Sequence, residues 1–158
     1  MRITIGIAEM HVSRDPEDLL VTHALGSCVG ISLHDPVARV GGILHYMLPL
    51  SSLDQEKAQK NPFMFGDTGI PEFFKRAYGA GATKENLRVC MAGGASVIQD
   101  MHHFDIGERN VVIARKLFWK NAVLIAGEHV GGAIPRTLFL DMASGNTWFT
   151  SGRDRVDL

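Results

Sequence analysis

Two alternating apolar runs around a short turn constrain this chain more than any other feature. The runs are "CVGISLH" at 28–34 and "VGGILHYML" at 40–48, and apolar side chains recur at every second position of each. This period is typical of β-strands that bury one face. Between them, "DPVA" at 35–38 predicts a turn, because Pro36 has the fixed φ that the second turn position requires. We therefore expect an antiparallel hairpin here.

The rest of the chain predicts more strands and two helices. Helices are expected over 68–79 and 107–121, the second with an acidic start and a basic end that suit the helix dipole. Strands are expected in "RITIGIAEMHV", "LLVTHAL", "LRVCMAG", "AVLIAGEHV" and the closing hairpin "RTLFLDMASGNTWFT". The polar segment 50–67 is expected to be a mobile loop over the mouth of any site. The expected fold class is α+β, a mainly antiparallel or mixed β-sheet with helices packed against it in layers.

Composition narrows the function classes. A length of 158 residues with 46% hydrophobic content suits one domain spanning 1–158. The 16 basic and 17 acidic residues nearly cancel, which argues against binding to nucleic acid or anionic lipid. The N-terminus has no continuous apolar core and no run reaches the length of a membrane span, so we expect a cytoplasmic protein without membrane insertion. Its two cysteines are then expected to be reduced thiols.

The turn at 35–38 also predicts which hairpin residues face each other. With that turn, Cys28 lies directly opposite His45, and their Cβ atoms are about 4.5–5.5 Å apart. Gly30 and Gly41 leave bare backbone on the same face, where a substrate can approach. This face is expected to be small and polar, and the opposite one to be core. A bulge at Gly41–Gly42 shifts the register by one residue, and that alternative stays open.

The two cysteines are expected to differ. A cysteine on an apolar strand is most often a small core residue, and Cys90 in "LRVCMAGG" fits that description. Cys28 follows a Gly-Ser step, begins its strand and faces a histidine. Such conditions can lower a thiol pKa from about 8.5 toward neutrality. Cys28 and His45 are therefore candidates for a nucleophile and its base.

The stretch "THALGSCVGISLHDPVARVGGILHYMLP" resembles the signature of the CheD family, bacterial chemotaxis enzymes that deamidate glutamine side chains of chemoreceptors. The resemblance continues through "AGGASVI", "IGERN" and "HVGGAIPRTLFLDMASGNTWF". It implies that the family's catalytic cysteine, histidine and threonine are Cys28, His45 and Thr22. The chain departs from the family pattern near Phe65, at His129, where an acidic or amide residue is usual, and at Pro135, where glycine is usual.

This resemblance implies a protein-glutamine glutaminase that works through a Cys28 thioester. His45 is the proton shuttle, and the Thr22 hydroxyl orients its ring. Backbone N–H groups around Ser27 and Cys28, on a tight turn allowed by Gly26, are the candidates for the oxyanion hole. Receptor cytoplasmic domains are the implied substrate, with weak methylesterase activity as a possible side reaction. The alternative is an adaptor that binds receptors and stimulates a CheC-type phosphatase.

Other motifs have plainer interpretations. His102 and His103 are adjacent, so in a strand they point to opposite faces, and no partner ligands stand at metal spacing. We therefore expect no metal and no cofactor. Glu108, Arg109 and Asn110 are interpreted either as part of a receptor-facing rim or as helix-capping residues.

Overall fold

The computed structural model describes residues 1–96 and 105–158 and contains two five-stranded sheets. One sheet has the order β1-β3-β8-β9-β10, made of Arg2–Thr4, Leu19–Leu25, Arg136–Asp141, Thr147–Ser151 and Asp154–Asp157. The other has the order β2-β5-β4-β6-β7, made of Glu9–Ser13, Val40–Tyr46, Val29–Asp35, Arg88–Gly93 and Ile125–Val130. The helices are α1 (Gln55–Lys60), α2 (Gly66–Gly79) and α3 (Ile106–Lys120), with short 3-10 turns at Ser51–Leu53, Pro62–Met64 and Lys84–Asn86.

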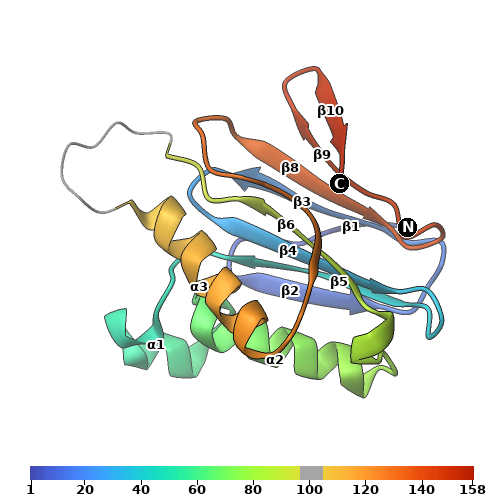
Figure 1. Cartoon of the computed structure of the whole chain (residues 1–158), viewed down its shortest axis with the longest axis horizontal. Helices are drawn as coiled ribbons and strands as arrows, with labels where there is room; N and C mark the ends of the chain where they lie inside the picture. Colours follow the sequence, from blue (N-terminus) through green and yellow to red (C-terminus); the bar gives the residue numbers. More distant parts are fainter. Residues whose placement is uncertain (97–104) are drawn as a thin grey trace.

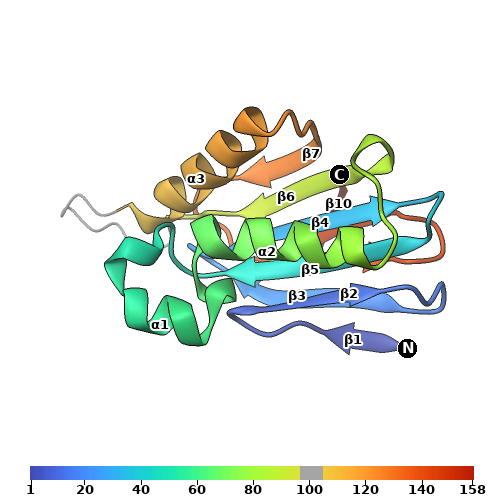
Figure 2. The ribbon, with the colours of Figure 1, turned by 90° about the horizontal axis from the view of Figure 1, so that it is seen from below.

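The two sheets and the helices form successive layers (Figure 1). One face of the β2-β5-β4-β6-β7 sheet packs on α2 and α3 through a core that includes Tyr46, Phe73 and Phe118. Its other face packs on the second sheet through a separate core that includes Ile43, Leu138 and Leu140. Figure 2 shows α2 and α3 on the face of this sheet that lies away from the second sheet. The predicted α+β class, with mixed sheets and layered helices, is confirmed.

The predicted hairpin is present, but its register differs by two residues. Gly30 pairs with His45, and the last pair before the loop is Asp35 with Val40. Cys28 is therefore diagonal to His45 rather than directly opposite. An even shift leaves every side chain on its expected face, because side chains alternate with a period of two. Cys28 and His45 still share one face.

The loop explains the shift. The Asp35 carboxylate accepts hydrogen bonds from the N–H groups of Val37 and Ala38, both at 2.9 Å, so Asp35 remains in the strand and caps the loop from its base. Arg39 takes a φ of 58°, which completes the reversal within residues 36–39. The turn is therefore one residue later than predicted, because a side chain satisfies the backbone donors of the loop.

The expectation that the glycines of one hairpin face leave room for a substrate is wrong. Every residue of β4 and β5 is buried, since the second sheet covers the face opposite the helices. A Cβ at Gly30 would lie 3.0 Å from Leu138 and 3.1 Å from Leu25, and one at Gly41 would collide with the Met142 side chain. These glycines allow the sheets to approach each other. They do not leave open space for a substrate.

Two other expectations need correction. The segment 50–67, expected to be a loop, contains the turn Ser51–Leu53, helix α1 and the turn Pro62–Met64. Short polar side chains start these elements: Asp54 accepts a hydrogen bond from the N–H of Lys57 at 3.1 Å. The N-terminal run expected to be one strand is divided between β1 and β2, which belong to different sheets and are separated by a turn in which Ala8 has a φ of 60°. The two predicted long helices are confirmed, with starts at Gly66 and Ile106.

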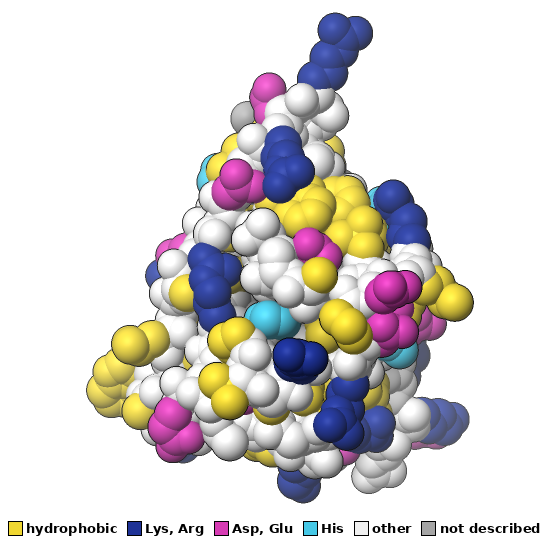
Figure 3. Space-filling model, turned by 90° about the vertical axis from the view of Figure 1, so that its right-hand side faces the viewer, with side chains coloured by type: hydrophobic (Ala, Val, Ile, Leu, Met, Phe, Trp, Pro, Cys, Tyr) yellow, Lys and Arg dark blue, Asp and Glu magenta, His cyan; other side chains and the backbone are white. Residues whose placement is uncertain are grey.

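In the described part of the chain, no helix is both long and apolar enough to cross a membrane. Figure 3 shows acidic and basic side chains interspersed over the face that it draws.

Candidate active site

The site is built across the interface between the two sheets. Thr22 belongs to β3 of one sheet and His45 to β5 of the other, and the Thr22 Oγ1 atom lies 2.7 Å from His45 Nδ1. Neither residue is exposed to solvent. The Thr22 hydroxyl also donates a hydrogen bond to the backbone carbonyl of Ile5 at 2.8 Å. One side chain thus joins the imidazole to the chain segment that follows β1.

These contacts determine the tautomer of His45. The Ile5 carbonyl can only accept, so it takes the single hydroxyl proton of Thr22. The oxygen of that hydroxyl must then accept a hydrogen bond from His45 Nδ1–H. In the neutral ring the lone pair is therefore on Nε2, which is buried and has no hydrogen-bond partner among the described residues. Burial lowers the pKa of His45 to about 4. At neutral pH the ring is an uncharged base with a free acceptor.

Cys28 lies immediately before β4 and is partly exposed. It is on the same face as His45, and Gly30, the residue opposite His45, has no side chain to separate them. No hydrogen bond joins the thiol to the imidazole among the described residues. Burial raises the pKa of the Cys28 thiol, and a bond from its own backbone N–H counteracts this only in part. The predicted lowering of this pKa is therefore wrong, because desolvation outweighs the neighbouring donors. The resting site pairs a neutral thiol with a neutral imidazole.

Neighbouring segments hold the backbone around Cys28. The carbonyls of Gly26 and Cys28 accept hydrogen bonds from the N–H groups of Ala95 and Gly94, at 2.8 Å and 2.9 Å. Among the described residues, neither the Ser27 N–H nor the Cys28 N–H donates a hydrogen bond to an oxygen atom. Ser27 and Cys28 are both partly exposed, so their N–H groups stay candidates for the oxyanion hole.

The predicted tight turn at Gly26 is not present in the expected form. The residue with a positive φ is Ala24, at 60°, and Gly26 is absent from the left-handed region. Gly26 N–H instead donates to the carbonyl of Ala24 at 3.0 Å.

Asn110 of α3 is a member of the site that the sequence interpretation missed. Its side chain is fully buried, and Nδ2 donates to the carbonyl of Ser27 at 2.9 Å and to that of Met47 at 2.8 Å. It is neither part of a rim nor a cap, and the capping residue of α3 is Asp105. The available signal was its position: Asn110 shares the buried stripe of α3 with Gly107 and other apolar residues, where an amide needs a specific partner.

The positions that depart from the family pattern lie outside this contact set. His129 Nδ1 accepts a hydrogen bond from Arg136 Nε at 3.0 Å, and its ring packs on Phe149 with centroids 4.5 Å apart. An acidic or amide side chain would also offer an acceptor to Arg136. Phe65 is fully buried beside Leu48, and Pro135 directly precedes β8.

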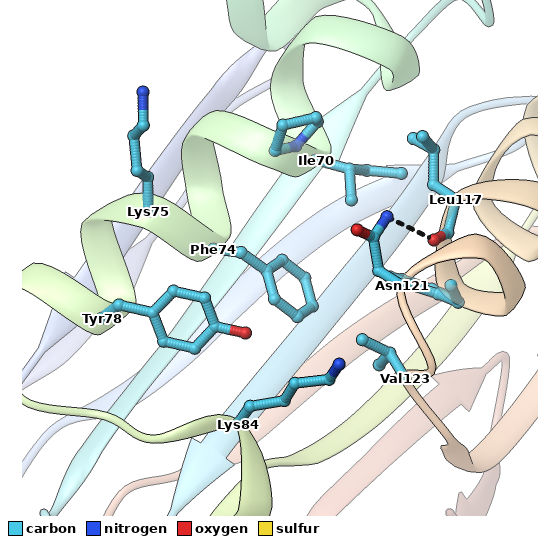
Figure 4. Close-up of a pocket in the computed structure, with 10 residues that line it drawn as sticks. Ile70, Phe74, Lys75, Tyr78, Lys84, Leu117, Asn121 and Val123 are labelled. Carbon is cyan, nitrogen blue, oxygen red and sulfur yellow. Dashed lines mark hydrogen bonds between the residues drawn. The ribbon is translucent and has the colours of Figure 1, made fainter.

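Other candidate sites have no comparable chemistry. Within residues 1–96 and 105–158, no three His, Cys, Asp or Glu side chains gather to hold a metal ion, and His102 and His103 lie outside the described residues. Figure 4 shows an apolar groove between α2 and α3, lined by Phe74, Leu117 and Val123 with Lys84 at its margin. Lys75, Tyr78 and Lys84 also line this groove, but among the described residues no cysteine, histidine or carboxylate does.

A family model and the curated relatives indicate the same family. The CheD family, described as CheD chemotactic sensory transduction, matches residues 47–151. A protein of Syntrophus aciditrophicus, named "Probable chemoreceptor glutamine deamidase CheD 1", is 48% identical over 94% of this chain and 93% of its own length. A "Probable chemoreceptor glutamine deamidase CheD" of Solibacter usitatus is 45% identical over 99% of this chain and 93% of its own length. With a family match over well over half of the chain and relatives at this level of identity along nearly all of it, the chain belongs to the CheD family.

Proposed function

We propose that this protein is a cysteine-dependent protein-glutamine glutaminase that converts glutamine side chains of methyl-accepting chemoreceptors to glutamate. The relatives bear the name of chemoreceptor glutamine deamidases. The observation that carries the proposal is the state of His45. Thr22 holds the Nδ1–H, and Nε2, which has no hydrogen-bond partner among the described residues, is on the same strand face as Cys28. That arrangement suits a general base for a thiol nucleophile.

In the first half of the reaction, the Cys28 sulfur attacks the side-chain carbonyl carbon of a glutamine. His45 Nε2 accepts the thiol proton as the S–C bond forms, because the resting thiol and imidazole are both uncharged. The carbonyl oxygen becomes an oxyanion, and the N–H groups of Ser27 and Cys28 stabilise it. The imidazolium then gives its proton to the departing nitrogen. Ammonia leaves, and a thioester remains on Cys28.

In the second half, water hydrolyses the thioester. His45 Nε2 takes one proton from the water as its oxygen attacks the carbonyl carbon. Collapse of the tetrahedral intermediate breaks the S–C bond, and the proton returns to sulfur. The product is glutamate. Thr22 acts by holding the ring through both steps, and its neutral hydroxyl stabilises the imidazolium less than a carboxylate would, so we expect a modest rate.

The test uses purified protein and a receptor cytoplasmic fragment. Ammonia release and the accompanying mass change are measured for the parent, Cys28→Ala and the control Cys90→Ala. Cys90 is fully buried in β6, so its variant should keep the parental rate if it folds, whereas Cys28→Ala should have none. Thermal melts of all three exclude a folding defect.

If a well-folded Cys28→Ala released ammonia at the parental rate, the thioester mechanism would be wrong. The adaptor function, with binding to receptors and to a CheC-type phosphatase, would then replace it.

A further inference from the structure

We propose that Asn110 is a positioning residue that aims the Cys28 N–H at the oxyanion. This inference rests on the proposed glutaminase reaction and adds a residue to it. Among the described residues, the Asn110 side chain makes no hydrogen bond to Cys28 or His45. It acts on the peptide units beside them.

The pairing of β4 with β5 ends just before the nucleophile. The last ladder pair is Val29 with Tyr46, so Cys28 and Met47 have no ladder bond to hold them together. At this point the Asn110 side chain enters from α3 and donates to the carbonyls of Ser27 and Met47. It replaces the missing ladder bonds, because it links the segment just before β4, which contains Cys28, to the segment just after β5.

The orientation of the amide is unambiguous. Nδ2 has two hydrogens and faces two carbonyl oxygens, at 2.9 Å and 2.8 Å. A flipped amide would place Oδ1 against both oxygens, with no hydrogen between them. The cost of the present orientation is that Oδ1 is buried without a partner among the described residues. An apolar side chain of the same size would avoid that cost, so packing alone does not account for an asparagine.

The hydrogen bond from Asn110 to the Ser27 carbonyl sets the direction of the Cys28 N–H. The Ser27 carbonyl and the Cys28 N–H belong to one planar peptide unit and point in opposite directions. A donor that holds the carbonyl therefore fixes the direction of the N–H. It also polarises the peptide and strengthens the N–H as a donor, because hydrogen bonds in series reinforce each other. The Cys28 N–H is near its own sulfur, as its partial lowering of the thiol pKa indicates. It is therefore close to where the oxyanion forms after attack.

The inference predicts a separation between two reactions of the same thiol. Deamidation passes through an oxyanion, whereas alkylation by iodoacetamide attacks a saturated carbon and needs no oxyanion hole. In Asn110→Leu, kcat for deamidation should fall by about 10- to 100-fold, because a misaligned oxyanion donor costs up to that much. The KM and the alkylation rate of Cys28 should stay within about threefold of the parent. The matched control is Asn121→Leu at the other end of α3, where the exposed side chain donates to Leu117, and its kcat should equal the parental value.

Each result decides the question. If the parent is active and the folded Asn110→Leu variant has the same kcat, only the proposed role of Asn110 is overturned, and the proposed function stands. A parent without glutaminase activity overturns the proposed function and this inference with it. Equal losses in deamidation and alkylation show a general disruption of the site and also overturn it.

If Asn110→Leu fails to fold, hydrogen exchange in the unmodified protein decides. The Asn110 side-chain amide protons should exchange far more slowly than those of Asn121. Equal exchange would show that the clamp does not hold in solution, and the inference would be wrong.

Discussion

Replacement of Thr22 by valine removes a hydroxyl and keeps nearly the same volume. That hydroxyl donates to the Ile5 carbonyl at 2.8 Å and accepts from His45 Nδ1 at 2.7 Å, between two sheets where neither side chain is exposed. The substitution therefore leaves one carbonyl and one ring N–H without partners in a buried interface.

The magnitude follows from those two groups. A buried polar group that loses its partner costs about 1–3 kcal/mol, and the added methyl group regains about 0.8 kcal/mol. With two such groups, the net loss in the free energy of unfolding is then about 1–5 kcal/mol. Catalysis should suffer separately. Without the Thr22 acceptor, the ring can protonate at Nε2 and lose its free lone pair, and it can also rotate, so kcat should fall by about 10- to 100-fold.

Urea denaturation measures the stability loss, and nitrogen NMR of His45 measures the tautomer directly. The control is Thr147→Val, a buried threonine of β9 whose hydroxyl donates to the Gly145 carbonyl at 3.2 Å and also bonds the Cys90 thiol. Among the described residues, no hydrogen bond joins this hydroxyl to His45. It should lose about 1 kcal/mol and keep the parental kcat. Thr22→Val with a parental kcat and an Nδ1–H tautomer would refute the reasoning, because the hydroxyl would then not determine the state of the ring.

Three further predictions concern titration and packing. Because the folded pKa of His45 is about 4 and the unfolded value is about 6.5, the unfolded state binds more protons between these values. The stability contributed by the neutral His45 ring should therefore be complete above about pH 6.5 and decline by about 3 kcal/mol as pH falls toward 4. His45→Gln should remove this part of the pH dependence of the free energy of unfolding in urea titrations, and an unchanged pH dependence would contradict the prediction. Cys28 should be alkylated faster than the fully buried Cys90. The pH midpoint of its alkylation rate should lie above the ordinary thiol pKa of about 8.5, since burial raises the pKa of Cys28. Faster labelling of Cys90, or a midpoint near pH 7, argues against this prediction. Gly30→Ala should lower the free energy of unfolding by about 1–3 kcal/mol, because the added Cβ would meet two leucines of the other sheet at 3.0 and 3.1 Å. Gly79→Ala, whose Cβ would have nothing within 4 Å, should not destabilise the protein in thermal melts. Equal effects of the two variants would show that the sheets can separate freely.

The local pattern of the chain determined the hairpin and the faces of its strands. Alternation has a period of two, so an error of two residues in the register left Cys28 and His45 on one face. The same alternation and the capping signals located most strands and both long helices. The exact register was not accessible from the pattern, because it depends on the Asp35 carboxylate binding the loop backbone.

Only the tertiary structure decided what lies against those faces. Thr22 meets His45 because two sheets pack together, and no spacing within either segment encodes that contact. Asn110 reaches the peptide beside Cys28 from a helix far along the chain. Burial between these layers raises the pKa of Cys28 and lowers that of His45, against the expectation from neighbouring residues alone. Desolvation is set by everything that surrounds a group in space, and the linear order of residues does not specify it.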